Sequence, residues 1–215
     1  MKKDYCEIVM VLDESGSMNS CKNDTIGGVN EFLNNQKRIK GDVNVTLIKF
    51  SDYYKVINDA VPLDQVVWLN NENYTPSNTT ALLDAAGKTI NSIGLRLSAT
   101  SEENRPEKVI FIIITDGFEN ASTEFTRRQV FDLVSHQREK YNWEFIFLGA
   151  DMDAWGDQIR VQKNVRIAKN DLSRSYKALS MFAIERRMYN FFDADDVFNL
   201  SEKELDQKLN DLDKK

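Results

Sequence analysis

Three apolar runs of strand length dominate the pattern of hydrophobic and polar residues along the chain. Each is almost continuous in hydrophobic residues, which is typical of central strands in a parallel sheet that is covered on both faces. We therefore predict buried strands at residues 7–12, 108–114 and 144–148.

A fourth segment, residues 43–50, alternates more between apolar and polar positions. Asn44 and Thr46, with Lys49 as a third candidate, are placed off the core, so we expect this strand nearer an edge of the sheet. Residues 53–60 follow after only two residues, which predicts that they turn back as an antiparallel edge strand.

Between these strands, apolar residues recur at spacings of three and four, which predicts helices. Gly41 is expected to end the first helix. Because strands and helices alternate, we predict an α/β, Rossmann-like fold with an open, mostly parallel sheet of about six strands and helices on both faces. The predicted helices span residues 24–40, 80–97, 126–140, 152–160 and 174–190, with a short strand at 164–168.

The C-terminal stretch is dense in charge and carries a weak amphipathic pattern. We predict one domain over residues 1–192 and a charged helical tail over residues 193–215. For this tail, a docked or frayed terminal helix is favoured over a partner-binding segment.

Composition and charge narrow the classes of partner. The formal net charge is −6 and no basic stripe offsets it, so a nucleic-acid partner is not expected. No run approaches the roughly 18 apolar residues of a membrane span, and the first residues lack a signal-peptide pattern. The sequence therefore predicts a cytoplasmic protein without membrane contact.

The two cysteines are not expected to form a disulfide. The first strand would carry the chain about 23 Å from Cys6 to Asp13, and Cys21 lies beyond that far end. A disulfide requires Cα atoms within about 7 Å, so two reduced thiols are predicted, as in a reducing compartment.

Short oxygen-bearing side chains gather where two strands end and one helix begins. Asp13, Ser15 and Ser17 follow the first strand, Thr80 opens the second helix, and Asp116 follows the strand at 108–114. The carboxyl ends of parallel strands form one edge, where ligands bind in open α/β sheets. Carboxylates and hydroxyls are the hard oxygen ligands that Mg²⁺ prefers, so together they predict a metal site, with Mn²⁺ as an alternative ion.

Each part of this site has a simpler explanation when taken alone. Serine and aspartate in the first loop could cap a helix, and Thr80 could be an ordinary N-cap. Asp116 followed by Gly117 is common in turns. Their shared position at one edge of the predicted sheet is what favours the metal.

The same residues resemble the metal-ion-dependent adhesion site of von Willebrand factor type A domains, and the wider similarity is to a bacterial and phage cytoplasmic branch over residues 5–183. The resemblance implies that Ser15, Ser17 and Thr80 contact the metal or its waters, and that Asp13 and Asp116 often act through bridging water. It also implies that the strand at 108–114 lies beside the first strand. The segments that carry the wider similarity are 24–28, 61–64, 80–85, 116–122 and 143–150.

Two positions depart from the family pattern. Asn78 and Thr79 stand where many members have two glycines before the site threonine, so the loop is expected to be stiffer. Thr79 is also a second threonine that could be mistaken for the metal ligand. Phe118 stands where many have glutamate, which leaves two interpretations open: a contact residue for a partner, or a side chain packed within its loop.

Other polar and aromatic residues carry weaker signals. His136 is predicted to be a surface or half-buried residue of a helix rather than a catalytic base, and Trp68, Trp143 and Trp155 are interpreted as packing residues or loop anchors. Asp151 and Asp153 follow another strand end, where helix capping is favoured over a place on the site's rim.

The leading functional hypothesis is a non-enzymatic module that binds a protein partner, whose aspartate or glutamate would complete the coordination of the metal. A metal-dependent phosphohydrolase is an alternative, although Ser15 stands where such enzymes need a second acid. A scaffold with a purely structural metal is a third.

Overall fold

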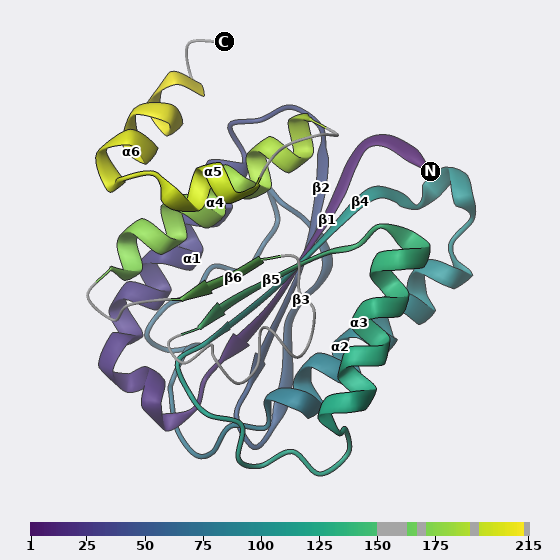
Figure 1. Cartoon of the computed structure of the whole chain (residues 1–215), viewed down its shortest axis with the longest axis vertical. Coiled ribbons are helices and arrows are strands. Elements are labelled where there is room, and N and C mark those ends of the chain that lie inside the picture. The colour runs from purple at the N-terminus through teal and green to yellow at the C-terminus, as the bar shows by residue number, and fades with distance from the viewer. Residues whose placement is uncertain (150–162, 167–170, 190–193, 213–215) are drawn as a thin grey trace.

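The computed structural model describes residues 1–149, 163–166, 171–189 and 194–212, which form a six-stranded sheet between two layers of helices (Figure 1). The strand order is β3-β2-β1-β4-β5-β6, and every neighbouring pair is parallel except β2 with β3. The predicted fold class is confirmed. The strands are β1 (Lys2–Asp13), β2 (Asp42–Phe50), β3 (Tyr54–Pro62), β4 (Pro106–Thr115), β5 (Glu144–Gly149) and β6 (Lys163–Arg166); the helices are η1 (Gly16–Cys21), α1 (Lys22–Gln36), α2 (Leu82–Ala99), η2 (Glu102–Asn104), α3 (Arg127–Tyr141), α4 (Leu172–Met188), α5 (Ala194–Asn199) and α6 (Glu202–Asp211).

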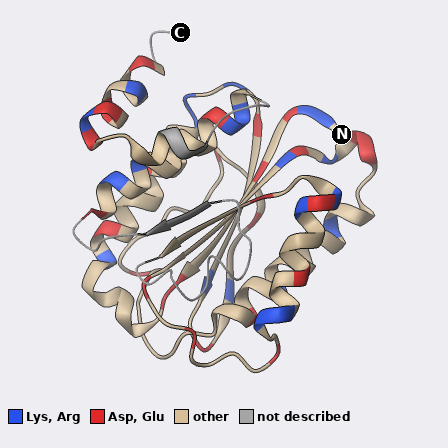
Figure 2. Ribbon diagram, viewed as in Figure 1, with Lys and Arg blue, Asp and Glu red and all other residues tan. Residues whose placement is uncertain are grey.

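β1 lies at the centre of the sheet and is apolar on both sides because helices cover both faces. Met10 and Leu12 face the core shared with α1 and α4, whereas Val9 and Val11 face the core shared with α2 and α3. Lys, Arg, Asp and Glu lie mainly on the helices and loops, and the inner strands are largely without them (Figure 2). This two-sided burial explains why the run at residues 7–12 shows no alternation.

β2 lies one strand from the edge and β3 forms the antiparallel edge, as predicted. The placement of Thr46 and Lys49 off the core is wrong, because both are buried. The Thr46 hydroxyl donates to Glu7 at 3.1 Å, and Lys49 pairs with Glu14. A polar residue in an alternating strand can thus be buried when it forms a hydrogen bond or an ion pair with a carboxylate from another strand or loop.

α1 ends at Gln36 rather than continuing to Lys40. Arg187 from α4 donates to the Gln36 carbonyl at 2.7 Å, which satisfies one of the acceptors left open at the helix end. Gly41 does not cap this helix. It adopts φ +109°, and a Cβ there would lie 2.7 Å from the Asp4 carbonyl oxygen, so glycine serves the close passage of two backbones.

The C-terminal helices α5 and α6 pack against α4 on the outside of the α1 layer (Figure 1). Leu205 and Leu209 of α6 are buried, and Lys177 of α4 forms ion pairs with Glu202 and Asp206. α6 is therefore docked, while the division of the chain at residue 192 stays a prediction. The helix predicted at 152–160 lies outside the described residues.

None of the helices in the described part of the chain is long and apolar enough to cross a membrane.

Candidate metal centre

Asp13 is the last residue of β1, and its carboxylate is fully buried at the carboxyl edge of the sheet. One carboxylate oxygen, Oδ1, accepts from the Ser15 backbone amide at 2.6 Å, and the other, Oδ2, accepts from the Thr115 hydroxyl at 2.5 Å. These contacts come from its own loop and from the end of β4. They fix the orientation of the carboxylate.

Ser15 and Ser17 place their hydroxyl oxygens 3.0 Å apart. Ser15 occupies the N-cap position of η1, but its side chain makes no capping hydrogen bond. The capping explanation of this loop therefore fails for Ser15, and its hydroxyl faces Ser17 instead. Two ligands at neighbouring corners of an octahedron with bonds of about 2.1 Å lie about 3.0 Å apart, so this spacing suits a magnesium ion.

Gly117 marks the point where the separate parts of the site converge. A Cβ added there would lie 2.9 Å from Thr80 Oγ1, 3.1 Å from Ser17 Oγ and 3.2 Å from Asp13 Oδ2. Oxygen atoms from three chain segments thus surround one small volume that only a residue without a side chain leaves open. The structure brings these predicted residues together.

Asp116 immediately precedes this glycine, and both of its carboxylate oxygens are buried. Burial raises the pKa of Asp13 to about 6, and the negative charge of Asp116 adds to the rise, whereas the hydrogen bonds from Thr115 and Ser15 oppose it. Two carboxylates held out of water repel each other and are stabilised by a cation between them. The electrostatics of the pair therefore favour a divalent ion.

The donor set fits a hard cation. Asp13, Asp116, Ser15, Ser17 and Thr80 offer only oxygen, and no group of three or more His, Cys, Asp or Glu residues that could hold a metal occurs within the described residues. Mg²⁺ accepts such oxygen ligands and keeps water molecules where the protein supplies too few. The residues present therefore fit a magnesium site of the predicted kind.

A buried cluster around Glu14 was missed from the sequence. The Glu14 carboxylate is fully buried, and Lys49 Nζ lies 2.7 Å from both of its oxygens. The Tyr53 hydroxyl and the Thr75 amide also donate to it. Glu14 is thus neutralised by the protein and holds the loop that leads to Thr80, although it stands between two predicted ligands.

In the loop before Thr80, Asn78 adopts a backbone conformation that usually favours glycine. Asn78 has φ +64°, a left-handed conformation that asparagine tolerates better than most residues. Its carbonyl accepts from the Gly16 amide at 3.1 Å, which ties this loop to the first. Thr79 is exposed and Thr80 is buried, so Thr80 is the threonine that faces the site.

Phe118 directly follows Gly117 in the sequence and is 62% exposed. An aromatic ring packed inside the loop would be largely covered, so the structure excludes that interpretation. The other interpretation, that Phe118 contacts a partner, stays a prediction.

The structure describes the surroundings of the histidine, of the two cysteines and of two of the three tryptophans. His136 is exposed on α3, as predicted, with its ring 5.7 Å from that of Tyr141. Trp143 is buried against Phe111 and Phe145, whereas Trp68 is partly exposed under Lys37. Cys6 and Cys21 are buried thiols and form no disulfide, which confirms that prediction. Asp151, Asp153 and Trp155 lie outside the described residues.

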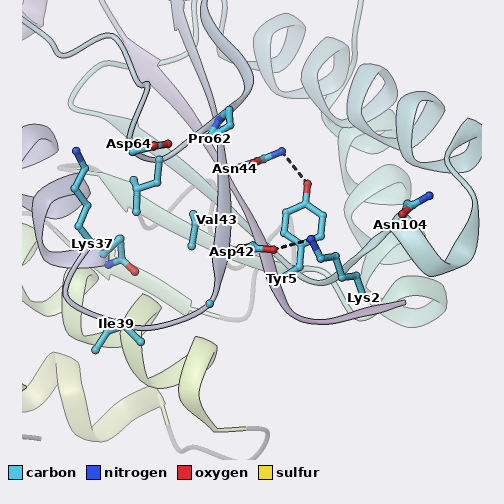
Figure 3. A pocket seen from close by; sticks show the side chains of 13 residues that line it. Lys2, Tyr5, Lys37, Ile39, Asp42, Val43, Asn44, Pro62, Asp64 and Asn104 are labelled. Atoms are coloured by element: carbon cyan, nitrogen blue, oxygen red, sulfur yellow. Dashed lines mark hydrogen bonds and ion pairs between the residues drawn. The ribbon is translucent and has the colours of Figure 1, made fainter.

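A hollow of about 640 Å³ lies at the opposite, amino-terminal edge of the sheet (Figure 3). Four of its charged and polar groups form two pairs: Lys2 Nζ lies 2.6 Å from an Asp42 oxygen, and Asn44 donates to the Tyr5 hydroxyl at 3.0 Å.

Comparison with known proteins supports the fold. The chain resembles the von Willebrand factor type A protein from Catenulispora acidiphila (TM-score 0.52, 13% identity, 85% of this chain and 43% of that chain). It also resembles proximal thread matrix protein 1 from the mussel byssus, solved with a zinc-occupied MIDAS motif (0.54, 12%, 86% and 47%). A third likeness is to the vWF domain of the type V pili tip protein Mfa5 from Porphyromonas gingivalis (0.57, 9%, 87% and 98%).

This chain spans less than half the length of the first two of these proteins. No protein-family model matches its sequence, and no curated protein does. At such low identity the likeness shows the fold alone. The chain has the fold of a von Willebrand factor type A domain, while its place in a bacterial or phage branch stays a prediction.

Proposed function

We propose that this protein is a non-enzymatic, metal-dependent module that binds a protein partner. Asp13, Ser15, Ser17, Thr80 and Asp116 would hold Mg²⁺, and an aspartate or glutamate of the partner would complete its coordination. The observation that carries the proposal is the convergence of three oxygen atoms on the space above Gly117. The similar fold of a mussel protein with a zinc-occupied MIDAS motif supports it.

The site has chemistry for binding rather than for bond cleavage. A bound Mg²⁺ with two carboxylates and neutral hydroxyls supplies an electrophilic position for an external carboxylate. The chain itself orients Asp13 through Thr115 and Ser15 and offers the exposed ring of Phe118, the residue after Gly117.

A phosphohydrolase needs a second acid and a cation for phosphate. Ser15 replaces the acid, and Lys49 is buried in its pair with Glu14, so the described residues of this loop supply neither. A cytoplasmic location belongs to the proposal as well, and the two buried thiols are compatible with a reducing compartment.

The test is calorimetric titration with MgCl₂ and MnCl₂, followed by a pull-down of partners with and without EDTA. Ser17→Ala is expected to weaken metal binding, whereas Ser20→Ala, which changes another exposed serine of η1, is the matched control. A wild-type protein that binds neither ion would disprove the proposal. Metal binding combined with partner capture that resists EDTA would favour a structural metal instead.

A further inference from the structure

The loop that follows β4 folds back onto the beginning of α2. The Glu119 carboxylate accepts from the Leu83 amide at 3.0 Å, and it also accepts from the amides of Ala121 and Ser122. Glu119 thus occupies the N-terminus of α2, where a negative charge is favoured by the open amides and the helix dipole. One end of the loop is fixed to the helix in this way.

A second carboxylate fixes the loop from the opposite side. Asp84 in the first turn of α2 accepts from three consecutive amides, those of Thr123, Glu124 and Phe125, at 2.8–2.9 Å. The loop and the helix therefore each contribute one acid to the other. With both acids engaged by backbone amides, the segment between them has little freedom to move.

Asn120 lies inside this segment and forms a two-way link with Thr80. Its side-chain oxygen accepts from the Thr80 amide at 2.9 Å, and its own amide donates to the Thr80 carbonyl at 3.1 Å. It stands four residues after Asp116, so it connects the two segments that supply these site residues. Its side chain is exposed, so replacing it leaves the core intact.

We propose that Asn120 is a positioning residue for the metal, an inference that rests on the proposed function. It fixes the Thr80 backbone against the β4 loop and so keeps Thr80 Oγ1 close to Gly117, without touching the ion itself. Groups that orient ligands in this way commonly change metal affinity by about 10- to 100-fold when they are removed.

The test compares Asn120→Ala, Asn120→Asp and Thr126→Ala by calorimetry with Mn²⁺ and by hydrogen exchange of the Thr80 amide. Asn120→Ala is expected to weaken Mn²⁺ binding about tenfold and to speed exchange at Thr80. Asn120→Asp keeps an acceptor oxygen and is expected to restore both. Thr126 caps α3 within the same loop, so Thr126→Ala should lower the stability of the protein to urea with no change in Mn²⁺ affinity.

Unchanged affinity in Asn120→Ala, or an equal loss in Thr126→Ala, would overturn the inference and leave the metal site standing. A wild-type protein without any binding isotherm would instead overturn the proposed function, and the role of Asn120 with it.

Discussion

Asp13 and Glu14 are adjacent in sequence and both fully buried, yet their surroundings are opposite. Glu14 meets the Lys49 ammonium group and the Tyr53 hydroxyl, so its charge is balanced within the protein. Asp13 meets a hydroxyl, an amide and the like charge of Asp116. The comparison shows that the protein itself balances the charge of Glu14, whereas Asp13 lies beside a second acid, whose charge the metal of the proposed function would balance.

The largest effect is expected on the Glu14 side. Lys49→Met leaves a buried carboxylate without its cation and should cost about 3–5 kcal/mol of unfolding free energy, measured by urea denaturation. The double variant with Glu14→Gln should lose much less than the sum. The control is Lys88→Met, because Lys88 and Glu124 form an exposed pair at 2.6 Å, worth under about 1 kcal/mol. A Lys49→Met loss no larger than the control would show that the buried pair does not stabilise the fold.

Removal of the Asp13 charge is expected to raise the free energy of unfolding, whereas removal of the Lys49 charge lowers it. Because the pKa of Asp13 is raised from 3.8 to about 6, the fold favours the protonated acid, and ionisation weakens the folded state as pH rises through this range. Without metal, Asp13→Asn should gain about 2 kcal/mol over the wild-type protein between pH 4.5 and pH 7.

Urea denaturation at the two pH values checks this prediction. Mg²⁺ should then stabilise the wild-type protein but not Asp13→Asn. Asp52→Asn, which changes an exposed aspartate at the same edge, should gain no stability over the wild-type protein between the two pH values and should still be stabilised by Mg²⁺. A wild-type protein that becomes more stable than Asp13→Asn towards pH 7 without metal would contradict the prediction.

A smaller effect is expected at the open space between the oxygens. Gly117→Ala adds a methyl group 2.9 Å from Thr80 Oγ1, so Mn²⁺ affinity by calorimetry should fall about tenfold, or ~1.4 kcal/mol. Gly27→Ala is the control, since nothing lies within 4 Å of a Cβ there. Equal affinity in both variants would place the metal elsewhere.

The smallest effect is expected at Tyr53. Tyr53→Phe removes one donor to Glu14 and should cost about 1 kcal/mol in urea denaturation, with metal affinity unchanged. Tyr141→Phe, at an exposed position on α3, should cost almost nothing. A loss of metal affinity in Tyr53→Phe would mean that the two carboxylates are coupled after all.

Much of the sheet could be predicted because β1, β4 and β5 are buried on both faces and therefore have nearly continuous apolar sequences. The five site residues could be found because strand ends in a parallel sheet meet at one edge, and their spacing along the chain marks those ends. Their role as metal ligands stays a prediction.

The surroundings of the site could not be predicted, because they depend on pairs that are distant in sequence. The sequence pattern predicts Lys49 off the core, but Lys49 is buried because it forms an ion pair with Glu14, 35 positions away. At the end of α1, the Gln36 carbonyl accepts a hydrogen bond from Arg187, 151 positions away. The hydrophobic pattern of a single segment carries no information about such distant partners.

The pairing of β1 with β4 also sets the order of events during synthesis. Thr115 lies 102 residues after Asp13, so a growing chain holds the first loop long before the strand that completes the site exists. Such long loop closure is a late and slow step in folding. Under the proposed function, a metal ion that needs both strands would bind only once the sheet has closed, so it would slow unfolding rather than speed folding.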